Sequence, residues 1–280
     1  MNVLLILINI NGYFHNVKVD GPSKLVYSLK PIPIFAERDY RRMIHNEPCL
    51  DTLSRMKDNS VDVVVTSPPY NMNLRIRKGK YCSRQIVDEE FATKYNNFSD
   101  NLPLEEYNKL HTNILRELLR VSELIFYNVQ LVTGSKRSVF KMIGEFSDNL
   151  KEIIIWDKGY APPAMHPQVL NRVSELILVF DTDYPISRKF SSKGRFERGT
   201  LNDIWRIKRS RSKNKKHSAV FPEELVETIL LNFSDEGDTI YDPFMGTGTT
   251  GVVAQRLGRK FIGSEISSEY VQTADERMEN

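Results

Sequence analysis

The sequence predicts an α/β protein built on a doubly wound, mostly parallel sheet. Short apolar runs typical of buried strands alternate with segments of helical periodicity along most of the chain. Two of these runs end in turns rich in proline or glycine, and open α/β sheets bind their ligands where strands end. With 280 residues, 40% of them apolar, the chain can bury one sizeable core and a small additional lobe.

Residues 1–40 are expected to form an N-terminal extension, whose role the sequence leaves unclear. Val3–Ile8 is apolar, but it lacks a basic flank and is too short for a membrane span, so we expect a strand or an extension rather than a signal. Only two cysteines occur, Cys49 and Cys82, which indicates a reducing compartment. We therefore expect a soluble, intracellular protein.

The run Val61–Val65 predicts a buried strand, and Ser67-Pro68-Pro69-Tyr70 ends it. Neither proline can donate to a ladder, so the chain must leave the sheet as a rigid, extended corner. The corner places backbone carbonyls, a serine hydroxyl and an aromatic ring side by side, which suits an amine on a planar ring. The alternative is an ordinary strand that ends in a diproline turn.

The middle of the chain supplies the other core elements. Apolar residues at helical spacing predict an amphipathic helix over 104–121. Strands are predicted at Leu124–Val129, Ile153–Trp156 and Leu176–Phe180, and Pro222 heads a helix through Asn232. Met72–Asn97 has no sustained periodicity and is long for a connection, so it is either a functional loop or a plain insertion.

A second turn follows the predicted strand that starts at Thr239. Gly246 and Gly248 permit a left-handed backbone and close approach, and they open a helix that runs to Arg256. The next strand ends in Glu265, 23 residues after Asp242, where a carboxylate can hold ribose hydroxyls. By itself the turn fits a dinucleotide site or a simple tight turn, and the lack of a following lysine excludes a Walker phosphate loop.

Taken together, these two segments resemble the motifs of the DNA amino-methyltransferases. Thr66-Ser67-Pro68-Pro69-Tyr70-Asn71 is similar to their catalytic motif. Asp242–Thr250 with Ile262–Glu265 resembles their S-adenosylmethionine site, and 172 residues separate Tyr70 from Asp242, which is the permuted order of the beta class. The resemblance covers residues 41–280 and implies a Rossmann-like methyltransferase sheet with a small target-recognition lobe.

The resemblance also implies a division of the chain and a set of site residues. It places the catalytic half in 41–160, a basic target-recognition region in 161–215 and the cofactor-binding half in 216–280. The implied catalytic residues are Ser67, Pro68, Pro69 and Tyr70. The implied S-adenosylmethionine-binding residues are Thr66, His217, Asp242, Pro243, Phe244, Gly246, Gly248, Thr249, Thr250 and Glu265. No spacing of histidine, cysteine and carboxylate residues suggests a metal site.

The net charge of +3 conceals a basic segment. Residues 187–217 hold 12 lysines and arginines against Glu197 and Asp203, so the rest of the chain is acidic. A basic strip with Phe190, Phe196 and Trp205 suits a DNA backbone, and the aromatics are available either for bases or for anchoring the lobe. The alternative is a solvated loop without a partner. The DNA-binding residues we expect are Arg75, Arg77, Lys78, Lys189, Arg195, Arg206, Lys208 and Arg209.

The expected reaction is direct methyl transfer from S-adenosylmethionine to the exocyclic amino group of a base flipped from double-stranded DNA. In the family, serine at the first motif position is commoner among N4-cytosine enzymes, so Ser67 favours cytosine, with N6-adenine as the alternative. An RNA methyltransferase or a catalytically silent DNA-binding protein is the alternative of another class. The family's frequent dimers suggest a homodimer, and a cognate restriction endonuclease is a candidate partner. The expected location is the cytoplasm of a bacterial or viral host cell.

Overall fold

The computed structural model describes residues 42–71, 102–132, 135–161, 167–183, 186–190, 193–209 and 222–279, and the backbone of five further strands in 4–27 and 75–82. The chain divides into two units, Met1–Tyr40 and Arg41–Asn280. The first contains an antiparallel sheet in the order β1-β2-β3, formed by β1 (Leu4–Ile10), β2 (Tyr13–Val19) and β3 (Leu25–Tyr27). The strand expected near Val3–Ile8 is therefore confirmed.

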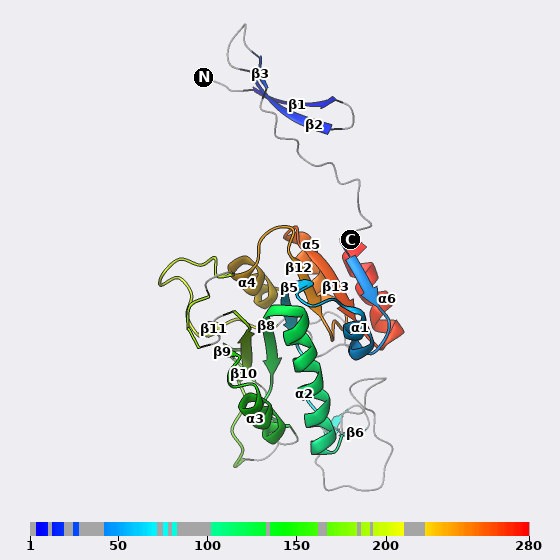
Figure 1. Ribbon diagram of the computed structural model, residues 1–280, viewed down its shortest axis with the longest axis vertical. Helices are drawn as coiled ribbons and strands as arrows, with labels where there is room; N and C mark the ends of the chain where they lie inside the picture. Colours follow the sequence, from blue (N-terminus) through cyan, green and yellow to red (C-terminus); the bar gives the residue numbers. More distant parts are fainter. Residues whose placement is uncertain are drawn as a thin grey trace. The chain divides into compact units, whose positions relative to one another are not determined.

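The second unit is built on an eight-stranded sheet in the order β11-β9-β10-β8-β5-β12-β13-β4 (Figure 1). Every neighbouring pair is parallel except those of β10, which runs antiparallel to both β8 and β9, so the mostly parallel sheet is confirmed. The strands are β4 (Arg42–His45), β5 (Val61–Thr66), β8 (Ser122–Val129), β9 (Leu150–Asp157), β10 (Ser174–Asp181), β11 (Ile204–Arg206), β12 (Thr239–Asp242) and β13 (Lys260–Ser264).

Helices cover both faces of this sheet. Val63 and Val65 of β5 belong to an apolar cluster with α4, α5 and α6, whereas Val64 belongs to a second cluster with α1, α2 and α3. Because all three valines are fully buried, the run lacks the polar alternation of a half-exposed strand. The helices are α1 (Cys49–Arg55), α2 (Leu104–Val121), α3 (Lys136–Glu145), α4 (Glu223–Phe233), α5 (Thr249–Arg256) and α6 (Ser268–Glu279). Within the described residues, none has the length and apolarity needed to cross a bilayer.

The order of the strands reverses between β5 and β12. From β12 the sheet continues through β13 to β4, and from β5 it continues through β8 in the other direction. Such a switch point leaves a crevice beyond the ends of its two strands, because the connections diverge to opposite sides. We call the side of the sheet on which the parallel strands end the carboxyl edge, and the opposite side the amino edge.

The predicted recognition region, 161–215, is partly built into the main sheet. It supplies β10 and the edge strand β11, which pairs with β9. Phe190 and Phe196 pack against Phe233 of α4 with ring centroids 5.1 and 5.4 Å away, and Trp205 is buried. These three aromatic side chains therefore anchor the segment on the core.

The predicted loop Met72–Asn97 contains a short hairpin of β6 (Arg75–Arg77) and β7 (Lys80–Cys82). The remainder of that loop, and the segment 210–221 that includes His217, lie outside the described residues.

Candidate active site

The proline corner after β5 is held from the start of α2. The Tyr107 hydroxyl donates a hydrogen bond to the carbonyl oxygen of Pro69 at 2.7 Å. Asn71 has a left-handed backbone with φ of 52°, and its side-chain amide makes two hydrogen bonds with the backbone of Leu102, at 2.9 and 2.7 Å. The sequence pattern of the two prolines ends the strand, and these contacts fix the direction in which the chain leaves it.

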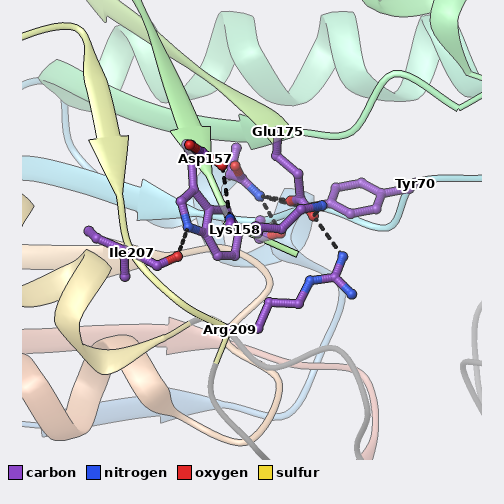
Figure 2. A network of polar contacts seen from close by, with 10 residues as sticks. Tyr70, Asp157, Lys158, Glu175, Ile207 and Arg209 are labelled. Carbon is purple, nitrogen blue, oxygen red and sulfur yellow. Dashed lines mark hydrogen bonds and ion pairs between the residues drawn. The ribbon is translucent and has the colours of Figure 1, made fainter. Parts of the chain in front are cut away.

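The side chains of the corner belong to a buried polar network (Figure 2). The Ser67 hydroxyl lies 2.8 Å from the Tyr70 hydroxyl, which donates to Glu175 Oε2 at 2.9 Å. The amide nitrogen of Asn128, at the end of β8, lies 2.6 Å from the Tyr70 hydroxyl and 2.8 Å from Glu175 Oε2. Tyr70 is 8% exposed, so its hydroxyl exchanges little with solvent and depends on these partners.

Glu175 is a buried carboxylate that two cations neutralise. Lys158 Nζ lies 2.9 Å from Glu175 Oε1, and the partly exposed Arg209 guanidinium lies 3.4 Å from the same oxygen. Burial opposes ionisation of Glu175, but the Lys158 charge and the hydrogen bonds from Lys158, Asn128 and Tyr70 outweigh it, so the pKa of Glu175 lies below its usual value. Glu175 is therefore ionised at neutral pH and can only accept hydrogen bonds.

On the other side of the switch point, Asp242 joins three elements. Its Oδ1 accepts hydrogen bonds from Thr66 Oγ1 at 2.8 Å and from the Phe244 backbone N–H at 3.1 Å, and its Oδ2 accepts one from Thr250 Oγ1 at 2.7 Å. One carboxylate thus connects the ends of β5 and β12 to the first turn of α5. Burial raises the pKa of Asp242 to about 6, although these hydrogen bonds favour the charged form.

This raised pKa predicts a pH-dependent stability. The folded protein holds the Asp242 proton more tightly than the unfolded chain, so the contribution of Asp242 to stability should fall as pH rises from about 4 to 6. Asp242→Asn should remove that loss, because its amide can donate to Thr250 while its oxygen still accepts from Thr66. Relative to wild type, we expect the variant to gain about 1–3 kcal/mol in free energy of unfolding between pH 4 and pH 7.

Urea unfolding of both proteins without cofactor at several pH values measures this difference. A stability difference between the variant and the wild type that stays constant from pH 4 to pH 7 would contradict the prediction.

The glycine turn after β12 leaves backbone accessible beside a carboxylate. Gly246 has a φ of 52°, and among the described residues no heavy atom beyond its chain neighbours lies within 4 Å of the position that a Cβ would take there. Glu265 accepts hydrogen bonds from the backbone N–H groups of Gly246 and Ser267, at 3.0 and 2.8 Å, and burial raises its pKa. Open backbone at a helix N-terminus and a carboxylate after the neighbouring strand form an arrangement that fits a nucleoside.

The structure brings most predicted catalytic and cofactor residues together around the switch point. Thr66 and Ser67–Tyr70 follow β5, while Pro243, Phe244 and Gly246 form the turn after β12, and Gly248, Thr249 and Thr250 open α5. Thr249 is buried, and its hydroxyl accepts a hydrogen bond from Arg277 of α6 at 3.2 Å. Thr66 and Thr250 each donate a hydrogen bond to Asp242, which ties the corner to the turn.

The predicted DNA-binding residues fall into separate groups. Arg206, Lys208 and Arg209 are exposed at the end of β11 on the carboxyl edge, and Lys189 is exposed in the preceding segment. Arg195 lies elsewhere, because its guanidinium pairs with Asp235, which precedes β12 at the amino edge. Arg75 and Arg77 lie on β6, of which only the backbone is described, and Lys78 lies outside the described residues.

Sequence reasoning missed Asn128, Lys158 and Glu175. The first two had a usable signal, because Asn128 lies near the end of one predicted strand and Lys158 follows another by two residues, where parallel sheets collect functional side chains. Glu175 opens β10, whose antiparallel direction brings its first residues to the carboxyl edge. The sequence carries no comparable signal for that direction.

The switch point of this doubly wound sheet combines a glycine turn that fits a nucleoside with a polar proline corner. This combination is typical of transferases that use a nucleoside cofactor. A family model described as DNA methylase, of the N6/N4 class, matches residues 61–276. The chain belongs to this family, and it is an S-adenosylmethionine-dependent DNA methyltransferase that acts on an amino group of a base.

Individual relatives agree with this assignment. The chain is 28% identical to the type II methyltransferase M.BglII of Bacillus subtilis, over 87% of this chain and 70% of that protein. It is 29% identical to the type II methyltransferase M2.DpnII of Streptococcus pneumoniae, over 81% and 85% of the two chains. The solved structure of the cytosine-N4-specific PvuII DNA methyltransferase shares the fold, with a TM-score of 0.62, 19% identity and coverage of 85% and 86%.

Proposed function

We propose that this enzyme methylates N4 of cytosine in double-stranded DNA, with the base flipped against the corner Ser67–Tyr70. The observation that carries the proposal is the hydrogen bond of 2.8 Å between Thr66 and Asp242. It joins the residue before the proline corner to the residue that opens the glycine turn, so an amine at the corner and a methyl donor at the turn share one crevice.

The residues around the glycine turn fit S-adenosylmethionine. The backbone at Gly246 borders open space, and each Glu265 oxygen keeps a lone pair for a ribose hydroxyl beside the N–H group that it already accepts. We assign Phe244, which lies in the same turn, to the cofactor site as well, through the motif resemblance. When bound, the cofactor supplies a methyl group that its sulfonium centre has already activated.

The corner has to make a weak nucleophile reactive, because the lone pair of an exocyclic amine is delocalised into the ring. We assign this task to two acceptors, the Ser67 hydroxyl oxygen and the Pro68 carbonyl oxygen, which accept the two amine hydrogens and localise the lone pair. The Tyr70 hydroxyl is tied to Glu175 and Asn128. These bonds hold the Tyr70 ring in one orientation for stacking on the flipped base.

Nucleoside mass spectrometry of methylated DNA tests the choice of base. Ser67 favours cytosine through the motif resemblance, so duplex DNA incubated with enzyme and cofactor should yield N4-methylcytosine. N6-methyladenine alone would contradict the cytosine assignment while leaving the amino-group mechanism intact. Methylation of single-stranded RNA in preference to duplex DNA would contradict the DNA substrate as well.

The exposed cations at the end of β11 are proposed to contact phosphates. Arg206 has a side chain that is 74% exposed, and among the described residues its charge partner is Asp157, 3.8 Å away. The double variant Arg206→Gln with Lys208→Gln should weaken DNA binding and lower the slope of log affinity against log salt by about 2, one for each phosphate contact.

Fluorescence anisotropy at several salt concentrations measures both quantities. Lys57→Gln is the control, because Lys57 is an exposed lysine just before β5, at the amino edge. An equal loss of affinity in the control would count against a DNA surface at the carboxyl edge.

Three broader features belong to the same proposal. The type II names of M.BglII and M2.DpnII support pairing with a restriction endonuclease that reads the same sequence. We also propose a homodimer, from the family resemblance, and an intracellular location, from the low cysteine content. Light scattering after size-exclusion chromatography distinguishes a dimer from a monomer.

A further inference from the structure

We propose that Glu175 is a positioning residue that sets the direction of the hydrogen-bond chain through Tyr70 to Ser67, so that Ser67 meets the target amine as an acceptor. This inference rests on the proposed function. A serine hydroxyl can either donate or accept, and only an accepting Ser67 localises the lone pair of an amine. Glu175 therefore determines whether the corner can activate its substrate.

The direction begins at the carboxylate. Glu175 is 6% exposed and ionised, so the contact of 2.9 Å with the Tyr70 hydroxyl requires Tyr70 to donate its proton to Glu175. Once that proton is committed, the Tyr70 oxygen can only accept from its other neighbours. The contact of 2.8 Å between Tyr70 and Ser67 then has one possible direction, with Ser67 donating.

Asn128 supports the same direction. Its amide nitrogen is 2.8 Å from Glu175 Oε2, and the reversed amide would set an oxygen against the carboxylate. The nitrogen therefore faces the network, and its contact of 2.6 Å with the Tyr70 hydroxyl is a donation to Tyr70. Ser67 and Asn128 thus both donate to the Tyr70 oxygen. The Asn128 nitrogen also lies 3.4 Å from the Ser67 oxygen, a long contact that takes up at most one lone pair of Ser67 and leaves the other for the amine.

Lys158 and Arg209 keep Glu175 in the form that this role requires. The Lys158 side chain is fully buried, and its ammonium group lies 2.9 Å from Glu175 Oε1, on the oxygen that Tyr70 does not use. Within the described part of the chain the two carboxylate oxygens have separate partners, with both cations on Oε1 and with Tyr70 and Asn128 on Oε2. A neutral amide at position 175 would keep the shape but lose this constraint, since its nitrogen can donate to Tyr70 and reverse the chain.

Glu175→Gln is the main test. We expect its rate of methyl transfer in a single turnover to fall about 10²-fold, because one preorganised acceptor is lost. The affinities for cofactor and for DNA should stay within about twofold, because binding does not depend on the direction of the chain. Glu175→Asp, which retains an acceptor-only carboxylate, should be faster than Glu175→Gln, and the opposite order would overturn the inference even if one variant folds poorly.

A double-mutant cycle separates positioning from a structural role. In a Tyr70→Phe background the chain is already broken, so adding Glu175→Gln should change the rate by less than about twofold. If the fold losses in rate of the two substitutions instead multiply, Glu175 acts independently of the Tyr70 hydroxyl and the inference is wrong.

A second buried pair provides the matched control. Lys151 and Asp181 lie 3.2 Å apart at the other end of β9 and β10, away from the corner. Asp181→Asn should retain a rate near that of the wild type when both are measured below their melting temperatures. A wild type that does not methylate DNA would refute the proposed function, whereas a wild type that does, with Glu175→Gln equally fast, would refute only the role of Glu175.

Discussion

Replacing Ser67 with alanine is expected to lower the rate of methyl transfer about 10²- to 10³-fold, which is the usual cost of removing one preorganised polar contact from a transition state. The structure explains why stability should change little. Ser67 is half-buried at the corner, and its hydroxyl contacts the Tyr70 hydroxyl. When the serine hydroxyl is removed, the Tyr70 hydroxyl keeps Glu175 and Asn128 as hydrogen-bond partners. The loss should therefore appear in kcat rather than in folding.

Transfer of a tritiated methyl group to duplex DNA measures this effect, together with the melting temperature. Ser60→Ala is a suitable control, because Ser60 is exposed before β5, at the amino edge, and its hydroxyl donates a local hydrogen bond to the Lys57 carbonyl oxygen. A Ser67→Ala rate within threefold of wild type would remove the serine from the mechanism.

Alanine at the two glycines of the cofactor turn should destabilise the fold to different extents. At Gly248, φ is 78°, and a Cβ would lie 2.8 Å from the Ala274 side chain and 3.2 Å from its Cα. Strain and overpacking against α6 should together cost about 2–4 kcal/mol of unfolding free energy. At Gly246 a Cβ would enter open space, so the cost to folding should be about 1–2 kcal/mol, from the left-handed backbone alone.

The affinity for cofactor should be affected in the reverse order, with the larger loss at Gly246. If the space beside Gly246 holds S-adenosylmethionine, the added methyl group occupies it, and affinity should fall at least about 10-fold, roughly 1.4 kcal/mol. Calorimetric titration measures the affinity, and urea unfolding measures the stability. Unchanged affinity in Gly246→Ala would place the cofactor elsewhere.

Much of the fold was predictable because its signals are local. The helix expected over 104–121 is α2, and the valine run is β5, since burial of both faces of a parallel strand leaves a continuous apolar stretch. The two turns were predictable for a similar reason. Proline and glycine restrict the backbone whatever surrounds them, so the ends of β5 and β12 could be located without knowledge of tertiary contacts.

The rest of the site depends on contacts between distant elements. Tyr107 lies on an apolar helical stripe typical of a core residue, and nothing in that stripe indicates that its hydroxyl binds the Pro69 carbonyl oxygen. Glu175 precedes a predicted strand, but its position depends on the reversed direction of β10. For Phe190 and Phe196 the sequence offered two roles and no means to choose between them. A basic segment with aromatic residues is compatible with DNA binding whether the rings contact bases or pack on the core, and here they pack on Phe233.

The contact between Thr66 and Asp242 spans 176 residues of sequence, and around it β5 and β12 pair at only two positions, Ile240 with Val63 and Tyr241 with Val64. The pairing of β5 with β12 is therefore a short seam between the two halves of the chain, which also meet where β4 pairs with β13, and the crevice overlies this seam. A ligand seated there touches both halves and adds its binding energy to the seam. Cofactor should consequently slow amide hydrogen exchange in β5 and β12 together. Binding in the crevice would thus stabilise the sheet on both sides of the seam.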